Sequence, residues 1–346
     1  MKILLIKRGA IGDILMTTPL VRQLRQNLPN AVIDYCVAFS FKVVLENNKY
    51  LDNIIALDDK MFNLNGLFGF MQFAFSVRKK YDYIFILGKS WQINLLGKIF
   101  SGIKIGYARE AISKFLLDKY VIYNNILRYH GLYYLDVLKI SGLGCPNYSD
   151  IELDLLITEK DRTAVLDKCN AYNLQGFVIV VNSGGNNQYE SGGIRMLPKD
   201  KILELLNALL RHHQVILLGG YVDRSNYTDY FEKLNCPTNL FNWAGELSLA
   251  QSTYLISLAK HVYTTDCGAM HLGVVAQLGN KMTCFFGPTH PQHVLPENKG
   301  FRIYWSDQDI FDKSYPLLGT ELTQKYFKNL NINDAIVNIC SAKVKG

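Results

Sequence analysis

The chain has 346 residues, of which 49% are hydrophobic and 19% charged, and its formal net charge at pH 7 is +7. These values are typical of a globular protein with room for two domains, and they exclude disordered and fibrous classes. No apolar run reaches the ~20 residues that a membrane-spanning helix needs, and the seven cysteines form no C-x-x-C pair, which argues against a disulfide framework or a zinc site and favours the reducing cytoplasm.

The positive charge is concentrated in the N-terminal half. Residues 1–150 carry 19 Lys and Arg against 11 Asp and Glu, a net of +8, whereas the remaining residues carry 18 against 19, a net of −1. A basic half is typical of proteins that meet a phosphorylated substrate, an anionic membrane surface or nucleic acid. A solvated basic surface without a specific partner explains the charge equally well. Because no nucleic-acid-binding motif is recognisable, we expect no nucleic-acid partner.

The apolar run at the start of the chain is too short for a signal peptide, and no cleavage site follows it. We therefore interpret Lys2–Lys7 as a buried first strand. A helix is expected within Ile14–Leu28. Pro19 either kinks this helix or marks its first turn after Thr18. Further strands of this half are predicted at Ala31–Val37 and Tyr83–Leu87.

The turn after the first strand, Lys7-Arg-Gly-Ala-Ile-Gly-Asp13, is rich in glycine but does not match the dinucleotide motif G-x-G-x-x-G. Gly9 and Gly12 allow the backbone to approach a ligand closely. Asp13 is the candidate general base: a helix start lowers the pKa of a carboxylate, and desolvation in a closed site raises it. The alternative role of Asp13, as a helix cap, stays open.

The aromatic run Phe62–Phe75, followed by Arg78-Lys-Lys80, allows two interpretations. It predicts a core helix with basic residues at its C-terminal end, or a helix that lies against a membrane; we prefer the core helix. Gly88-Lys-Ser90 is similar to the end of a Walker A loop. Because Tyr83 stands where that motif has its first glycine, we reject a P-loop.

A cluster of Gly, Pro, Asn and Ser between Gly142 and Asp150 predicts the domain boundary, with domains at 1–150 and 151–346. Pro198 suits the first turn of the next long helix, and Ser248-Leu-Ala-Gln251 is a capping-box pattern. A C-terminal helix is expected at Ile332–Ile339, either within the second domain or packed back on the first. The other elements expected here are strands at Phe177–Val181, Val215–Leu218, His261–Thr265 and Met282–Phe286 and a helix at Met270–Leu278.

Strands alternate with helices in both halves, which predicts an α/β fold with two Rossmann-like, doubly wound parallel sheets. In open sheets of this type, ligands bind at the carboxyl ends of the strands. We therefore expect the two domains to face a cleft that holds the ligands.

The strongest functional signal is the segment Thr264-Thr-Asp-Cys-Gly-Ala-Met-His-Leu272. A strand that turns at Gly268 into a helix presents amide groups and a positive dipole end, which together bind phosphate. An ordinary turn with Asp266 as the helix cap is the competing interpretation. The turn Phe286-Gly-Pro-Thr-His-Pro291 favours phosphate binding, because it follows the next strand and ligands collect at such strand ends.

A long polar loop follows the strand at Phe177–Val181. It runs from Asn182 to Arg195, includes Ser183 and Gly184, and contains four glycines, which suits a segment that contacts phosphate. Arg195 can pair with two phosphate oxygens at once. A surface loop with a solvated arginine is the alternative.

Taken together, these residues resemble the lipopolysaccharide heptosyltransferases of glycosyltransferase family 9 over nearly the whole chain. The resemblance rests on the start KILLIKRGAIGDILMTTPLVRQLRQNLPNAVIDY, the loop GGIRMLP, and TTDCGAMHLG with FFGPTHP, supported by LLGGYVDR and WAGELSL. It implies a GT-B architecture, with an acceptor domain first and a donor domain second. It also implies an inverting, metal-independent transfer of L-glycero-D-manno-heptose from ADP-heptose to the inner core of lipopolysaccharide.

Carried over by position, the resemblance makes Asp13 the base that takes the proton of the acceptor hydroxyl. Arg195 stands where the family usually has a phosphate-binding lysine. The implied partners are an ADP-sugar donor, a lipid A–Kdo or heptosylated core acceptor, and the inner face of the inner membrane. The other implied donor contacts are the turn Asp266, Cys267 and Gly268, His271 at the start of its helix, Leu247 at an adenine-contacting position and, as a weaker candidate for the ribose, Asp223.

The chain departs from the family pattern in the donor half. Cys267 replaces the usual Ser or Thr, and Arg195 keeps the charge of the usual lysine with a different geometry. Three alternatives stay open: a related glycosyltransferase with another nucleotide-sugar or glycan acceptor, a nucleotide-dependent oxidoreductase, and a sugar-nucleotide-binding module without catalysis. The missing G-x-G-x-x-G motif counts against the oxidoreductase.

Two patterns that are similar to metal sites are rejected, and we expect no metal and no cofactor. Asp307-Gln-Asp309 matches the D-x-D pattern of metal-dependent glycosyltransferases, but its polar surroundings near the C-terminus predict a surface turn. His290-Pro-Gln-His293 has no third ligand nearby.

Overall fold

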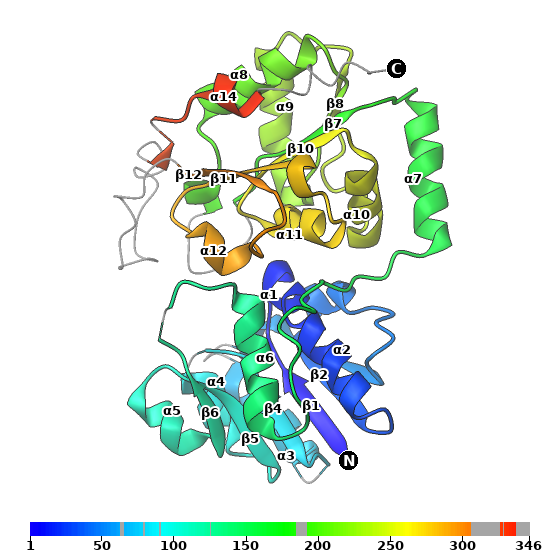
Figure 1. Cartoon of the computed structure of the whole chain (residues 1–346). Coiled ribbons are helices and arrows are strands. Elements are labelled where there is room, and N and C mark those ends of the chain that lie inside the picture. Colours follow the sequence, from blue (N-terminus) through cyan, green and yellow to red (C-terminus); the bar gives the residue numbers. More distant parts are fainter. Residues whose placement is uncertain are drawn as a thin grey trace. The chain divides into compact units, whose positions relative to one another are not determined.

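The computed structural model describes residues 1–62, 66–78, 80–89, 91–124, 126–184, 192–305, 326–327 and 329–336. The chain forms two compact units. Unit 1 comprises Met1–Leu156 and Gln292–Val294, and unit 2 comprises Ile157–Pro291 and Leu295–Gly346. Each unit has a parallel six-stranded sheet between helices (Figure 1). The predicted α/β class with two doubly wound sheets is therefore confirmed.

The sheet of unit 1 has the order β3-β2-β1-β4-β5-β6, and all its strands are parallel. The central strands β1 and β4 are apolar and almost entirely buried, as expected for strands covered on both faces. The strands are β1 (Lys2–Ile6), β2 (Val32–Ala38), β3 (Asn53–Leu57), β4 (Tyr83–Ile86), β5 (Ile103–Ala108) and β6 (Lys119–Ile122).

Two layers of helices cover this sheet. On one face α2 packs against α6; the other layer contains α3, α4 and α5 in contact with one another in that order. Phe70 and Ala74 of α3 belong to the same buried cluster as Leu4, Ile6 and Ile84 of the sheet. The helices are α1 (Ile11–Leu15), α2 (Thr18–Asn27), α3 (Leu67–Ser76), α4 (Trp91–Gly97), α5 (Ala111–Leu116) and α6 (His130–Ser141), with short 3₁₀ helices at Phe39–Val44 (η1) and Asp59–Phe62 (η2).

The single helix expected within Ile14–Leu28 is two helices, α1 and α2. Thr17 occupies the N-cap position of α2, and its hydroxyl donates to the carbonyl of Ile14 at 2.7 Å. Pro19 therefore lies in the first turn of α2, where its missing N–H costs no hydrogen bond. Of the two roles expected for Pro19, the first-turn role is confirmed.

Unit 2 repeats the plan, with the strand order β12-β11-β10-β7-β8-β9 and parallel pairing throughout. Its helices are α7 (Glu159–Ala171), α8 (Lys199–Leu210), α9 (Arg224–Lys233), α10 (Leu249–Leu258), α11 (Gly268–Val275), α12 (Pro291–Val294) and α14 (Ile332–Ile336), with 3₁₀ turns at Gly192–Arg195 (η4), Tyr221–Asp223 (η5) and Gly279–Lys281 (η6). Its strands are β7 (Val178–Val181), β8 (Val215–Leu217), β9 (Leu240–Asn242), β10 (His261–Thr265), β11 (Met282–Phe286) and β12 (Arg302–Trp305).

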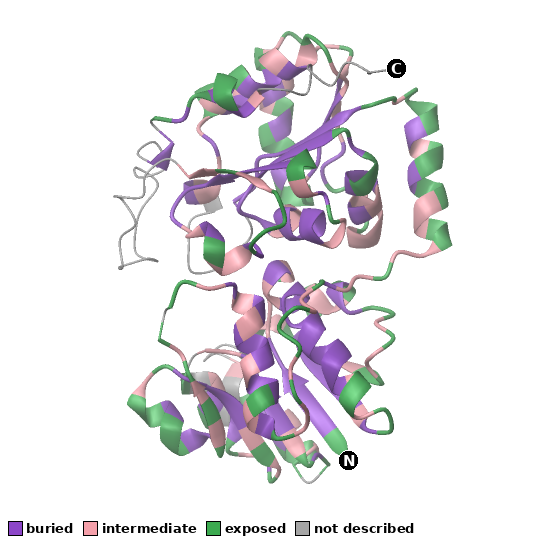
Figure 2. Ribbon diagram, in the orientation of Figure 1, coloured by how far each residue is buried: buried purple, intermediate pink, exposed green. Residues whose placement is uncertain are grey.

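The core of unit 2 lies between the sheet and helices α8, α9 and α14, and the buried residues of both units follow the sheets (Figure 2). Ile332 and Ala335 of α14 are buried in this core, and α14 packs on α8. The described part of the C-terminal helix therefore belongs to unit 2, and its packing back on the first domain stays a prediction. Residues 337–339 of that expected helix lie outside the described residues. No helix among the described residues is long and apolar enough to cross a membrane.

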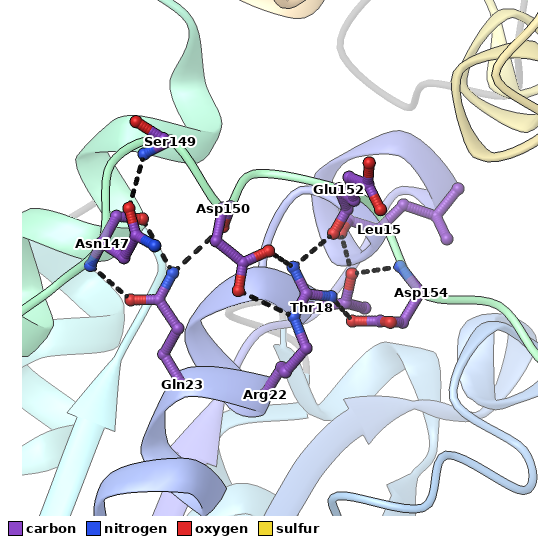
Figure 3. A network of polar contacts seen from close by, with 9 residues as sticks. All are labelled: Leu15, Thr18, Arg22, Gln23, Asn147, Ser149, Asp150, Glu152 and Asp154. Carbon is purple, nitrogen blue, oxygen red and sulfur yellow. Dashed lines mark hydrogen bonds and ion pairs between the residues drawn. The ribbon is translucent and has the colours of Figure 1, made fainter.

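A polar network ties the segment that leads toward unit 2 onto α2 of unit 1 (Figure 3). The guanidinium of Arg22 pairs with the carboxylates of Asp150, at 2.7 Å, and Asp154, and donates to the carbonyl of Glu152 at 2.9 Å. Thr18 accepts a hydrogen bond from the amide of Asp154 at 2.8 Å. These contacts hold residues 150–154 on unit 1, which ends at Leu156.

Candidate functional site

In unit 1 the charged candidates gather where β1 and β4 lie side by side. The chain runs from β1 outward to β2 and β3 on one side, and returns to β4, β5 and β6 on the other. The strand order therefore reverses between β1 and β4, and the carboxyl ends of strands at such a point are where open α/β sheets bind ligands. Lys7 follows β1 directly, Asp13 lies in α1, and Lys89 follows β4.

Asp13 forms an ion pair with Lys7, whose Nζ lies 3.0 Å from its Oδ2. The Lys7 side chain is only 8% exposed, and that of Asp13 is 37% exposed. Burial works to raise the pKa of Asp13, but the charges of Lys7 and Lys89 outweigh it and hold this pKa below its usual value. Asp13 is therefore ionised at neutral pH and able to accept a proton. Ala10, not Asp13, occupies the N-cap position of α1.

Lys89 is a second cation beside Asp13 that the sequence analysis did not single out. Its Nζ donates to the hydroxyl of Tyr123 at 3.1 Å and lies 4.3 Å from the centre of that ring. Burial lowers the pKa of Lys89 to about 7, although the charge of Asp13 opposes the shift. Burial also lowers the pKa of His130, which is hydrogen-bonded to Tyr123, to about 2. The signal available in the sequence was a lysine at the end of a buried strand.

The two glycines of the first turn have different surroundings. A Cβ placed on Gly9 would lie 2.3 Å from ring carbons of Phe41, so this position needs glycine for packing against η1. Gly12 is buried within α1. The close approach to a ligand that we expected at these glycines stays a prediction.

In unit 2 the corresponding reversal lies between β7 and β10. Ser183 follows β7, and Thr265 is the last residue of β10. The hydroxyl of Thr265 donates to the carbonyl of Ser183 at 2.6 Å and accepts from its amide at 3.2 Å. Ser183 and the adjacent Gly184 are buried at this end of the sheet, beside the predicted phosphate-binding turn.

Asn182 anchors both ends of the long loop that follows β7. Its amide group donates to the carbonyl of Leu197 at 3.2 Å and accepts from the Leu197 amide at 2.8 Å. It also donates to the hydroxyl of Tyr230 at 3.1 Å, and the whole arrangement is buried. The side chain of Asn182 thus joins the residue after β7 to Leu197, which lies two residues before α8. Residues 185–191 of this loop lie outside the described residues.

Arg195, at the end of this loop, reaches the predicted diphosphate turn. Its Nη1 lies 3.0 Å from Oδ2 of Asp266, whose side chain is 3% exposed. The structure therefore brings these two candidates together. Asp266 is not the cap of the following helix, because Cys267 occupies the N-cap position of α11 and forms no side-chain capping bond.

Helix α11 begins at Gly268, so the amides of its first turn lie next to the Arg195–Asp266 pair. Cys267 is buried, and burial raises the pKa of its thiol, so the side chain is neutral at physiological pH. His271 is buried within the helix. An amide-lined helix start beside an arginine suits an anion such as a diphosphate.

Asp223 lies in the turn after β8 and is buried. Its Oδ2 accepts a hydrogen bond from the amide of Gly220 at 2.8 Å. Burial raises the pKa of Asp223, against the opposing effects of the Gly220 amide and of Ser183. Leu247 is partly buried and precedes the confirmed capping box of Ser248 and Gln251. Contacts of Asp223 and Leu247 with a nucleotide stay predictions.

The described residues contain no group of three or more His, Cys, Asp or Glu side chains placed to hold a metal ion. Asp307 and Asp309, whose D-x-D pattern we rejected, lie outside the described residues. His290 packs against Trp305, with ring centres 4.4 Å apart.

Comparison with known proteins agrees with the fold. Residues 71–314 match the model of glycosyltransferase family 9 (heptosyltransferase). Lipopolysaccharide heptosyltransferase 2 of Escherichia coli is 26% identical over 314 residues, which cover 88% of this chain and 87% of the relative. Among solved structures, a family 9 glycosyltransferase from Veillonella parvula aligns with a TM-score of 0.72 at 19% identity, covering 96% of this chain and 97% of its own. The E. coli ADP-heptose lipopolysaccharide heptosyltransferase II aligns with 0.68 at 21%, covering 88% and 90%.

Proposed function

Since the chain belongs to glycosyltransferase family 9 and is a glycosyltransferase with the GT-B fold, we propose that it transfers L-glycero-D-manno-heptose from ADP-heptose to the inner core of lipopolysaccharide. The observation that carries this proposal is the distribution of charged groups over the two sheets. An ionised carboxylate stands at the strand reversal of unit 1, and an arginine with a helix start stands at that of unit 2. The E. coli relative, which is named a lipopolysaccharide heptosyltransferase, supports heptose as the donor sugar.

In the proposed reaction Asp13 takes the proton of an acceptor hydroxyl. The hydroxyl oxygen then bonds to the anomeric carbon of the donor sugar from the face opposite the diphosphate. The bond between that carbon and the diphosphate oxygen breaks, and its electron pair leaves with ADP. Arg195 and the first-turn amides of α11 stabilise the added negative charge. This displacement inverts the anomeric centre and needs no covalent intermediate.

Asp266 has a positioning role in this scheme. It holds the guanidinium of Arg195 at 3.0 Å beside the start of α11, so the arginine is in place before the donor binds. In unit 1, Lys7 keeps Asp13 ionised. The net charge of +8 on residues 1–150 suits an acceptor that carries Kdo carboxylates and phosphates, at the cytoplasmic face of the inner membrane.

The donor is tested by calorimetric titration of the protein with ADP-, UDP- and GDP-linked sugars. We expect binding of ADP-linked sugars in clear preference to the other two, and a preference for a UDP- or GDP-sugar would contradict the donor assignment.

Chelation with EDTA is expected to leave turnover unchanged. A loss of turnover that added Mg²⁺ restores would contradict metal independence.

The base is tested by Asp13→Asn, which keeps the shape of the side chain and removes its ability to accept a proton. We expect transfer to fall by 10²-fold or more, while calorimetry shows unchanged affinity for the ADP-sugar. Turnover close to that of the wild type would remove Asp13 from the mechanism. Donor binding without turnover in the wild type, with either acceptor, would favour a binding module over an enzyme.

A further inference from the structure

The helix layer α3, α4 and α5 of unit 1 exposes large apolar side chains. On each helix they recur at helical spacing, so each pair lies on one side of its helix. The exposed fractions are 72% for Phe68 and 55% for Phe75 on α3, 37% for Trp91 and 46% for Leu95 on α4, and 47% for Ile112 and 79% for Phe115 on α5. We call these six residues the α3–α5 face. Because α3 contacts α4 and α4 contacts α5, the three pairs belong to one layer.

The same helices bury other residues, so their exposed apolar side chains are not needed to complete the core. Phe70 and Ala74 of α3 are fully buried against the sheet, whereas Phe68 and Phe75 of the same helix point away from it. The colouring of Figure 2 shows the same alternation of buried and exposed residues on α5. The predicted core helix thus accounts for only one side of α3. Its other side exposes Phe68 and Phe75.

Positive charge accompanies this apolar surface. Residues 67–116 contain eight Lys and Arg against two Asp and Glu. Of these cations, Lys89 lies near Asp13 and Lys104 pairs with Asp118, so neither is counted with the face. Arg78, Lys80, Lys98 and Lys114 are exposed on this layer, and the guanidinium of Arg78 lies 6.0 Å from the ring centre of Phe75. Residues 151–346, by contrast, carry a net charge of −1.

We propose that the α3–α5 face binds the surface of an anionic phospholipid bilayer. Aromatic and aliphatic side chains enter the boundary between headgroups and acyl chains, while lysine and arginine pair with lipid phosphates. A second copy of the chain fits less well, because apposing two such faces would bring two excesses of positive charge together. The inference rests on the proposed function for its purpose, which is to place the enzyme where a lipid-linked acceptor is held.

The effect of each substitution on vesicle binding follows from two contributions, the attraction of lysine to anionic lipid and the burial of apolar side chains in the interface. Each lysine near an anionic surface is worth roughly a fivefold change in the vesicle partition coefficient. Withdrawing one phenylalanine from the interface is worth about tenfold. Phe115→Ser is therefore expected to weaken binding about tenfold, and Lys98→Glu with Lys114→Glu more than twentyfold, on the order of two lysine contributions.

The experiment measures flotation of the full-length protein with vesicles of phosphatidylcholine, with and without phosphatidylglycerol. We expect binding only when phosphatidylglycerol is present, and its loss in Phe115→Ser and in the Lys98/Lys114 variant. Matched controls are Leu166→Ser and the pair Lys160→Glu with Lys233→Glu, which change exposed residues of the same kinds in unit 2. Brominated lipids are expected to quench the fluorescence of the wild type more than that of Trp91→Phe.

Equal flotation of wild type and α3–α5 variants would overturn the proposal. So would variants that dissociate an oligomer of the wild type while binding vesicles normally, because the face would then join copies of the chain. Turnover on a water-soluble, deacylated acceptor shows that each variant is folded, and we expect it unchanged. If the wild type shows no turnover on the deacylated acceptor but binds vesicles through the α3–α5 face, the proposed function is contradicted and the proposed membrane-binding surface is supported.

Discussion

The ionisation of Asp13 depends on two lysines that approach it from different strands. Lys7 comes from the end of β1 and Lys89 from the end of β4, and together their charges outweigh the burial that works to raise the pKa of Asp13. This balance lowers the basicity of Asp13 and secures its charged form. In the proposed mechanism, a base with a lowered pKa acts by its position beside the acceptor more than by intrinsic strength.

Replacing Lys7 by Met tests this balance. The variant removes the nearest positive charge while burial remains, so the pKa of Asp13 should rise above its wild-type value. We expect wild-type kcat/KM to show no loss from Asp13 down to about pH 5, and the variant to lose activity on the acid side at higher pH. The measurement is a pH–rate profile. Lys7→Arg keeps the charge, so its activity at acidic pH should match that of the wild type. Identical pH–rate profiles for Lys7→Met and the wild type would contradict the role of Lys7.

The lowered pKa of Lys89 should make the free energy of unfolding depend on pH. Its pKa is about 7 in the folded protein against 10.5 for the free side chain, so between these values the unfolded chain holds a proton that the folded chain lacks. Stability of the wild type therefore rises with pH across this window, and the cost of the buried charge is fully present below pH 7. Lys89→Met should be more stable than the wild type below that pH, by roughly 1–3 kcal/mol, with the advantage shrinking toward pH 10.5. Urea unfolding at several pH values measures it, and a constant difference would refute the assignment.

At this scale the sequence gives part of the site. Asp13, Arg195 and Asp266 were predicted because each follows a strand at a glycine-rich turn, and the structure pairs the latter two. Lys89 was not predicted, because its place beside Asp13 depends on the adjacency of β1 with β4, which joins segments about eighty residues apart in the chain. The anchoring contacts of Asn182 were not predicted either, because its partner Tyr230 lies 48 residues further along.

At the scale of elements, the long loop of unit 2 is held by one buried amide side chain. Asn182→Leu removes its three side-chain hydrogen bonds to Leu197 and Tyr230 and leaves their buried groups without these bonds. We expect a loss of about 1–3 kcal/mol in unfolding free energy and weaker donor binding, because Arg195 lies on the same loop. Chemical denaturation and calorimetry measure the two effects. Tyr230→Phe, which removes one of the three bonds, should show a smaller loss; equal losses would argue against the anchor.

The elements best predicted are those buried on both faces. The strands His261–Thr265 and Met282–Phe286 agree with β10 and β11 at both ends, because long apolar β-branched and aromatic runs have few alternatives. Among the strands that were not predicted, β6 alternates partly buried and exposed residues, whereas β5 is exposed only at its first residue; both mix lysine with apolar residues. In β5 an interior glycine also weakens the signal, although Gly106 is required, since a Cβ there would lie 2.7 Å from the carbonyl of Ile86.

For the whole molecule, the prediction of two doubly wound sheets is confirmed because each strand is followed by a helical or long connection, and parallel pairing needs such crossovers. The order of the strands was not predicted. The sequence predicted a domain boundary between residues 142 and 150, where turn-forming residues cluster. The structure fastens residues 150–154 to α2 through Arg22, a pairing across 128 residues that composition does not reveal.

Arg22→Met tests that fastening. It leaves Asp150 and Asp154 without their guanidinium partner around a residue that is 7% exposed, so we expect a loss of about 3 kcal/mol in unfolding free energy. Hydrogen exchange of residues 147–156 should also become faster. The matched control is Arg25→Met on the same helix, which breaks the ion pair with Asp52 and the hydrogen bonds to the carbonyls of Tyr50, Pro29 and Ala31. It contacts none of residues 150–154, so hydrogen exchange of residues 147–156 should stay unchanged. Equal effects of the two substitutions would show that the network does not hold the segment.

The Arg22 network also sets an order of events during biosynthesis. A ribosome releases Arg22 and the rest of α2 early, but the carboxylates that neutralise this arginine lie 128 and 132 residues further along the message. Until they emerge from the exit tunnel, the nascent first half carries an uncompensated cation on a surface that the finished protein covers. Docking of residues 150–154 on α2 therefore awaits translation past Asp154, and a stalled chain released at residue 149 would lack these anionic partners.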